Sequence, residues 1–251
     1  MTKYVLLDPN QHKNIKILPH KNFKQSEHQH LTPLSVNEFA QASTSFPIVY
    51  MKDAEQGKFR AISMLGLLAG KNLFFTENEW LGTYVPSTFL RTPFDLGPDP
   101  KAEKTLTLYI DQDSDYLSQT EGEALFNENE PSQFLLSIQQ NISAYYQSEM
   151  MTHQFTELLL KHDLLVEIEL ATQYESMEQN KIKGLYTINE TSLNGLSQEV
   201  LFEFHQLNFL MPIYAMLASL TQINRLMTLH NKTQNRKITG IKMNINKGDE
   251  L

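Results

Sequence analysis

The chain has 251 residues, of which 41% are hydrophobic and 20% charged, and its formal net charge is −8 at pH 7. This length is enough for one large domain or two small ones with a buried core. The negative charge argues against a general nucleic-acid-binding protein, which needs clustered Lys and Arg, and the absence of cysteine excludes disulfides, thiolate metal sites and a cysteine nucleophile.

The first half of the chain is predicted to be mainly an antiparallel sheet. Segments rich in β-branched and aromatic residues recur between breaks made by Gly, Asn, Asp and Pro. These predicted strands are 4–7, 46–51, 58–68, 72–76 and 105–111. A helix is expected at 35–43, because Ser35 and Glu38 have the spacing of a capping box.

The second half is predicted to be mainly helical. Apolar residues recur at helical spacing from Pro131, which suits a first turn, to about His162, with Asp163 just past the end. Further along the chain, strands are predicted at 165–172 and 181–189, and helices from Ser197 and over 208–229. The segment from Arg225 to Lys247 is interpreted as an exposed, mildly basic tail.

This order of elements indicates the α+β class: an antiparallel sheet in the N-terminal half, a long central helix, a small β-pair and two C-terminal helices. The chain is interpreted as one domain over 1–251, which could be divided into a mainly β lobe, 1–130, and a mainly α lobe with the β-pair, 131–251. The longest apolar stretch, 207–220, contains an Asn and a Pro and is too short for a membrane span. We therefore expect a soluble, cytoplasmic protein with no membrane span.

Acidic residues alternate with other residues in several places, two of which bear on possible sites. Asp111, Asp113 and Asp115 imitate a calcium-binding loop, but Tyr116 and Gly122 occupy the positions where an EF-hand needs Gly and a bidentate Glu. Asp111 is therefore predicted to end a strand, and no metal or other cofactor is predicted for the chain. In the strand at 165–172, Glu167 and Glu169 alternate with apolar residues and are interpreted as a solvent-facing row.

The stretch 79–100 is the best candidate for a binding site. It combines the single Trp of the chain with other aromatic residues, an Arg and four prolines that stiffen the path, and such residues dominate binding hot spots. Alternatively, the aromatic rings fill space against the sheet and the Arg pairs with a buried acid such as Asp95 or Asp111. The candidate binding residues are Trp80, Tyr84, Arg91, Phe94 and Asp111.

Several stretches carry a family resemblance. The strongest are the run Trp80–Gly82–Tyr84–Pro86, which leads to Arg91–Pro93–Phe94, and the pattern ID…S…GEALF that follows it. On these stretches, together with FPIVYM, AISMLGLLAGKNLFF and IYAMLASLTQINRL, the chain resembles the SapC family of bacterial proteins over nearly its whole length.

The resemblance implies an association with bacterial surface-layer (S-layer) systems, for which the family is named. Related genes also lie near outer-membrane receptors and flavin-dependent halogenase-like proteins. The resemblance implies no defined activity and no catalytic residue, and it does not extend to the peptide-transporter permease known by the same letters. Relatives commonly have an aromatic residue in place of Thr92 and often a second Arg in place of Leu90, so a function that needs a doubled Arg is not implied.

Three functions follow as hypotheses. The leading one is a non-enzymatic accessory protein of a cell-surface or export system that binds a protein or a small ligand, because no recognised nucleophile, phosphate-binding or metal motif occurs. The second is an enzyme for a small anionic or polar substrate, with Arg91 as the anion clamp and Asp111 or Glu121 as general acid or base. The third is a structural homo-oligomer subunit, which predicts an apolar patch on the C-terminal helices.

Overall fold

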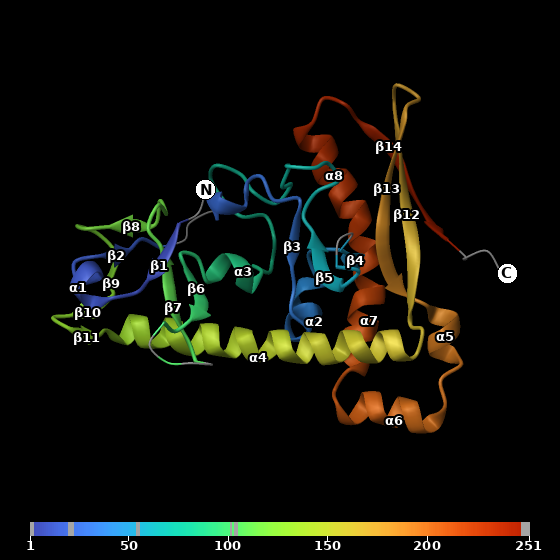
Figure 1. The fold of residues 1–251 in the computed structure, drawn as a ribbon. Coiled ribbons are helices and arrows are strands. Elements are labelled where there is room, and N and C mark those ends of the chain that lie inside the picture. The colour runs from blue at the N-terminus through green and yellow to red at the C-terminus, as the bar shows by residue number, and fades with distance from the viewer. Residues whose placement is uncertain (1–2, 20–22, 54–55, 101, 103–104, 247–251) are drawn as a thin grey trace. The chain divides into compact units, whose positions relative to one another are not determined.

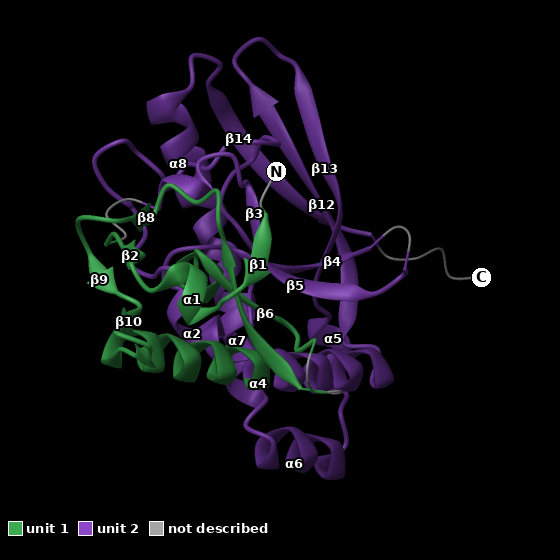
Figure 2. Ribbon diagram, turned by 60° about the vertical axis from the view of Figure 1, so that its left-hand side comes forward, with its two compact units in different colours: residues 1–21, 87–147 green, residues 22–86, 148–251 purple. Residues whose placement is uncertain are grey.

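The computed structural model describes residues 3–19, 23–53, 56–100, 102 and 105–246. The chain divides into two compact units (Figure 2). Unit 1 comprises Met1–Lys21 and Ser87–Gln147, and unit 2 comprises Asn22–Pro86 and Ser148–Leu251. Helices and antiparallel sheets occur together, with a long central helix and C-terminal helices, so the predicted α+β class is confirmed.

Unit 1 is built from short strands and a small helical part. Its three-stranded sheets have the orders β1-β7-β6 and β8-β2-β9, and β10 pairs with β11. The elements are β1 (Tyr4–Leu6), α1 (Pro9–His12), β2 (Lys16–Ile17), α3 (Ser87–Leu90), β6 (Phe94–Pro98), β7 (Leu106–Asp111), β8 (Leu117–Ser118), β9 (Glu123–Ala124), β10 (Phe126–Asn127) and β11 (Glu130–Pro131). Apolar residues of β6 and β7 form the core of this unit with residues such as Leu135 and Ile142 of α4.

The long helix α4 (Gln133–Lys161) contributes its first part to unit 1 and its second part to unit 2. It begins two residues later than the sequence predicted, because Pro131 belongs to β11 and the Ser132 hydroxyl accepts the Leu135 N–H. At the other end Asp163 has φ 51°, and the Leu164 N–H bonds the Leu159 carbonyl. Asp163 in this left-handed conformation ends α4, and it lies just past the helix as the sequence predicted.

Unit 2 contains one six-stranded sheet with the order β14-β12-β13-β4-β5-β3, in which every neighbouring pair is antiparallel (Figure 1). Its strands are β3 (Leu31–Pro33), β4 (Ile48–Lys52), β5 (Phe59–Met64), β12 (Leu165–Tyr174), β13 (Gln179–Ile188) and β14 (Ile238–Ile245). The predicted β-pair, now β12 and β13, joins the strands of the N-terminal half through β13 and β4. Fully buried Tyr50 of β4 shares a hydrogen bond with Thr156 of α4 (2.9 Å), which ties the sheet to the second part of that helix.

The remaining elements of unit 2 are short helices. They are η1 (Lys24–Ser26), η2 (Val36–Glu38), α2 (Phe39–Ala42), α5 (Glu190–Asn194), α6 (Gln198–Gln206), α7 (Leu210–Ser219), η3 (Leu220–Gln222) and α8 (Ile223–Thr233). Ser197 caps α6 as predicted, since its side chain accepts the Val200 N–H. The predicted helix over 208–229 is divided into α7, η3 and α8. None of the helices in the described ranges is long and apolar enough to cross a membrane.

Two predicted segments are wrong. Segment 72–76 is not a strand: among the described residues it makes only a single bridge, between Phe75 and Trp80. The segment from Arg225 to Lys247 is not an exposed tail. Its described part forms α8 and β14 and places buried residues such as Leu226 and His230 in the core, while Lys247 lies outside the described residues.

Candidate functional site

The predicted binding residues belong to two different units. Trp80 and Tyr84 lie in unit 2, whereas Arg91, Phe94 and Asp111 lie in unit 1. Their use by a ligand or partner stays a prediction, and the surroundings of each group are described within its own unit.

Trp80 is embedded among aromatic rings of unit 2. Its ring centroid lies 5.8 Å, 6.1 Å and 6.0 Å from those of Phe23, Phe46 and Phe74. Its indole Nε1 donates a hydrogen bond to the Tyr84 carbonyl oxygen (2.8 Å). The half-buried indole is thus held by packing and by its one donor, as expected for a buried Trp.

Tyr84 connects this aromatic cluster to a helix start. Its hydroxyl donates to Oε1 of Glu38 (2.8 Å), while Oε2 of Glu38 accepts the Ser35 N–H and hydroxyl. The capping box predicted from Ser35 and Glu38 is therefore present. Gly82 allows the close approach of Trp80 and Tyr84, because a Cβ there would lie 2.5 Å from Nε1 of Trp80.

The charges of Arg91 and Asp111 both act on Tyr4 in unit 1. Arg91 forms an ion pair with Asp95 (2.6 Å), and its guanidinium carbon lies 4.7 Å from the ring centre of Tyr145. Burial raises the pKa of Tyr4, the charges of Asp95 and Asp111 raise it further, and Arg91 opposes the shift. The pairing of Arg91 with Asp95 is one of the two arrangements that the sequence offered.

Phe94 and Asp111 are both buried, at 2% and 6% exposure. Phe94 is part of the apolar core of unit 1. Asp111 ends β7, as predicted, and its carboxylate accepts the backbone N–H of Lys3 (2.9 Å) and of Asp113 (3.3 Å). No group of three or more His, Asp or Glu suited to a metal ion lies within the described ranges.

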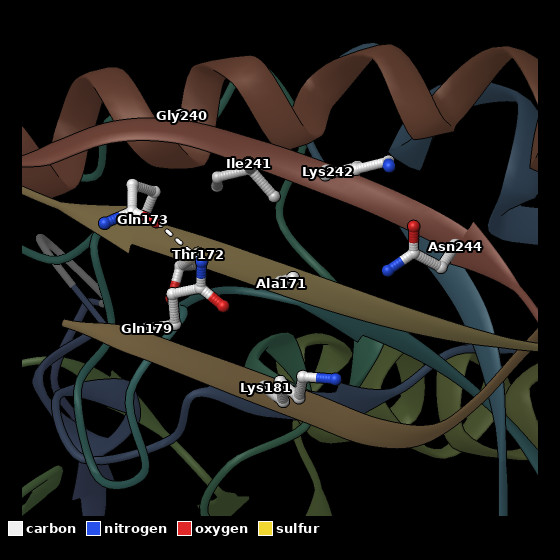
Figure 3. A pocket seen from close by; sticks show the side chains of 9 residues that line it. All are labelled: Ala171, Thr172, Gln173, Gln179, Lys181, Gly240, Ile241, Lys242 and Asn244. Atoms are coloured by element: carbon white, nitrogen blue, oxygen red, sulfur yellow. Dashed lines mark hydrogen bonds between the residues drawn. The ribbon is translucent and has the colours of Figure 1, made fainter. Parts of the chain in front are cut away.

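A pocket lies on the sheet of unit 2, across β13, β12 and β14 (Figure 3). Its volume is about 450 Å³, within the range of small-molecule sites. Amide and ammonium side chains dominate the lining, with those of Lys181, Lys242 and Asn244 near one end. At the other end Gln179 donates to the Gln173 side chain (2.8 Å). In this view α8 lies behind the sheet, so it covers the opposite face.

One carboxylate forms ion pairs with two lysines at this pocket. Glu169 of β12, whose side chain is only 9% exposed, forms ion pairs with Lys181 (2.9 Å) and Lys183 (3.7 Å). The hydrogen bond from Lys181 lowers the pKa of Glu169, burial opposes this, and the charges of both lysines add to the lowering. Lys242 makes no hydrogen bond or ion pair with the described residues. The pocket therefore holds a cation that is available to a ligand.

Comparison with known proteins gives a family. A model of the SapC family matches residues 7–226. The chain belongs to the SapC family. Neither the curated proteins nor the solved structures give a match. The resemblance seen in the sequence is thus confirmed, and any activity has to be argued from the geometry.

The sequence did not single out the pocket of this SapC-family chain. Glu169 was interpreted as solvent-facing, which is wrong, because it is 7% exposed and neutralised by lysines. The alternating Lys181 and Lys183 on the neighbouring strand were the available signal, since opposite charges across adjacent strands attract. The approach of Lys242 depends on the pairing of β14 with β12, which no local pattern indicates.

The pocket is better suited to binding than to proton transfer. General acid or base catalysis needs a group whose pKa lies near the working pH. Glu169 is shifted in the opposite direction, away from neutrality, by its lysine partners. Lysine and amide groups can instead bind the charged and hydroxyl oxygens of a polar, negatively charged ligand.

The lowered pKa of Glu169 predicts a loss of stability in acid. Because the folded-state pKa lies below the unfolded value of about 4.3, the ion pairs contribute fully above that value and are lost as the pH falls through the folded pKa. We expect the melting temperature to drop more steeply between about pH 5 and pH 3 in the native chain than in Glu169→Gln. Circular dichroism melts across this range measure it, with Glu190→Gln as the exposed control, and equal slopes for the native chain and Glu169→Gln would contradict it.

Proposed function

We propose that this SapC-family chain is a binding protein that acts without catalytic chemistry of its own, as a cytoplasmic accessory component of a bacterial cell-surface (S-layer) or export system. The surface-layer context comes from the family resemblance. The binding role rests on the pocket between β13, β12 and β14, which Lys242 lines without a counter-charge among the described residues, together with three amide side chains. This chemistry fits a ligand that carries carboxylate or phosphate and hydroxyl groups.

The surroundings of the predicted site favour this proposal over the enzyme hypothesis. Arg91 is already engaged by Asp95 and by the ring of Tyr145. Asp111 is buried and accepts two backbone N–H groups, while Glu121 is exposed. Arg91 as a clamp and Asp111 as a base would first have to give up these contacts.

A second candidate, the homo-oligomer subunit, is favoured by one surface. Helix α7 contains no charged residue, yet Met211 and Tyr214 on its outer side are 55% and 57% exposed, and Phe202 of α6 is 58% exposed. A helix that is apolar on all sides is usually covered. A second copy of the chain is one way to cover this face.

A thermal-shift screen of sugar acids, sugar phosphates and dicarboxylates, with neutral sugars as controls, tests the proposed function. A ligand present at 100 times its Kd stabilises the native state by about 2.7 kcal/mol, which corresponds to a rise in Tm of about 5 to 10 °C for a chain of this size. Lys242→Gln should weaken binding about 10- to 100-fold, because it removes a charge-assisted hydrogen bond.

Lys232→Gln is the matched control, since Lys232 is an exposed lysine of α8 outside the pocket, and it should bind like the native chain. Equal affinity in Lys242→Gln and the native chain would contradict the proposal. Binding that disappears in Arg91→Ala but persists in Lys242→Gln would instead support the Arg91 clamp of the enzyme hypothesis.

A further inference from the structure

Strand β14 forms one end of the six-stranded sheet and pairs only with β12 among the described strands. It is eight residues long, and most of its residues are half-buried or exposed. An edge strand presents unpaired N–H and C=O groups that can accept another extended chain.

The register identifies which backbone groups face outward. The Asn246 N–H donates to the Glu167 carbonyl, which makes these two residues a hydrogen-bonded pair. Because such pairs alternate with non-hydrogen-bonded pairs in an antiparallel ladder, the backbone groups of Ile241, Met243 and Ile245 point away from β12. These three residues therefore supply the donors and acceptors of the open edge.

The two faces of this edge have different chemistry. On the pocket face lies Lys242, without a counter-charge among the described residues. On the opposite face, Met243 and Ile245 are 39% and 55% exposed. A strand added here would meet a cation on one face and apolar side chains on the other.

The side chains of β12 can be compared with those expected of an added strand, because β12 already pairs with the other side of β14. It carries Glu167 and Glu169 on the pocket face, and Ile168 and Leu170 on the other face, opposite Ile245 and Met243. The apolar side chains of β12 thus meet those of β14, but the residue opposite Lys242 is Ala171 and not an acid. An acidic side chain opposite Lys242 on the open side would supply the charge that β12 lacks, since both sides of a strand present the same two faces.

We propose that the open edge of β14 binds an extended segment of a partner polypeptide in which acidic and apolar side chains alternate. This inference rests on the proposed function and names its partner class. Backbone hydrogen bonds to the edge provide affinity, and the alternate side chains provide specificity. The acidic side chains lie over Lys242 and the pocket, and the apolar ones pack beside Met243 and Ile245.

A designed peptide tests this. The probe is the acetylated, amidated and fluorescently labelled heptapeptide Glu-Val-Glu-Val-Glu-Val-Glu, and the counter-probe has Lys in place of Glu. Fluorescence anisotropy should show binding of the acidic peptide, weakened by added salt, and about tenfold or more weaker binding of the basic one. Amide hydrogen exchange at Ile241, Met243 and Ile245 should slow when the acidic peptide is bound.

Met243→Pro is the decisive variant. Proline removes an N–H that faces outward and leaves the ladder with β12 intact, as edge strands tolerate. Binding of the acidic peptide should weaken about tenfold or more, while Met243→Ala, which keeps the N–H, should bind within about threefold of the native chain. Unchanged far-ultraviolet circular dichroism verifies that both variants fold.

Three outcomes would overturn the inference: no binding of the acidic peptide at millimolar concentration, equal binding by Met243→Pro, or a dimer in light scattering that Met243→Pro dissociates, which would mean that a second copy occupies the edge. The proposed function is judged separately. A sugar acid or phosphate ester that binds the native chain and Met243→Pro, but not Lys242→Gln, would support the pocket even if the peptide fails.

Discussion

Replacing Trp80 with alanine should lower the free energy of unfolding by about 3 kcal/mol, because large aromatic truncations in packed surroundings cost about 3–5 kcal/mol. The indole packs against three phenylalanine rings, of which Phe46 and Phe74 have no exposed surface. It also supplies the hydrogen bond to the Tyr84 carbonyl, so the loop around Gly82 loses its fixed position with it. Urea unfolding followed by circular dichroism measures this change.

Trp80→Phe separates the two contributions. It keeps an aromatic ring in the cluster and removes the N–H donor together with part of the ring volume, so we expect a loss of about 1–2 kcal/mol, smaller than that of Trp80→Ala. A small stability loss in Trp80→Ala, together with lost binding to a ligand or partner, would contradict the structural role. That result would restore Trp80 as the recognition residue that the sequence predicted.

Local sequence patterns correctly predicted the elements whose structure depends on residues that are close together in the chain. The periodicity of α4, the stop at Asp163 and the capping box of Ser35 and Glu38 each depend on residues within one or two turns. β14 could not be predicted in this way. It contains Gly240 and Asn244, which are poor strand formers, and its extended form depends on pairing with the distant β12.

The candidate site likewise combines contacts that are local in the sequence with contacts that depend on tertiary structure. The ion pair of Arg91 and Asp95 joins residues four apart, and the sequence offered it as an alternative. The pocket joins Lys181 and Lys242 through three strands that are paired by tertiary structure. The alternation of Glu167 and Glu169 indicates the open face of the strand, but not that Glu169 is covered there, because its burial depends on Lys181 and Lys183 of the neighbouring strand.

Glu38→Ala should be about as destabilising as the loss of Trp80, with a decrease of about 3 kcal/mol in the free energy of unfolding. Glu38 is 5% exposed, and its carboxylate accepts hydrogen bonds from the Ser35 N–H, the Ser35 hydroxyl and the Tyr84 hydroxyl. Hydrogen bonds to a charged group contribute about 1.5–3 kcal/mol each, and the donors left behind are partly shielded from water. Urea unfolding and thermal melts of the variant measure the effect.

Tyr84→Phe and Ser35→Ala identify which contacts carry this stability. Each removes one side-chain hydroxyl and should cost about 1–2 kcal/mol, and a double-mutant cycle of Glu38→Ala with Tyr84→Phe should show coupling of at least about 1 kcal/mol. The reason is that the Tyr84 hydroxyl can donate this hydrogen bond only while the Glu38 carboxylate is present. Additive effects would contradict this account, because they would mean that the Tyr84 hydroxyl does not depend on Glu38 and is held by other contacts.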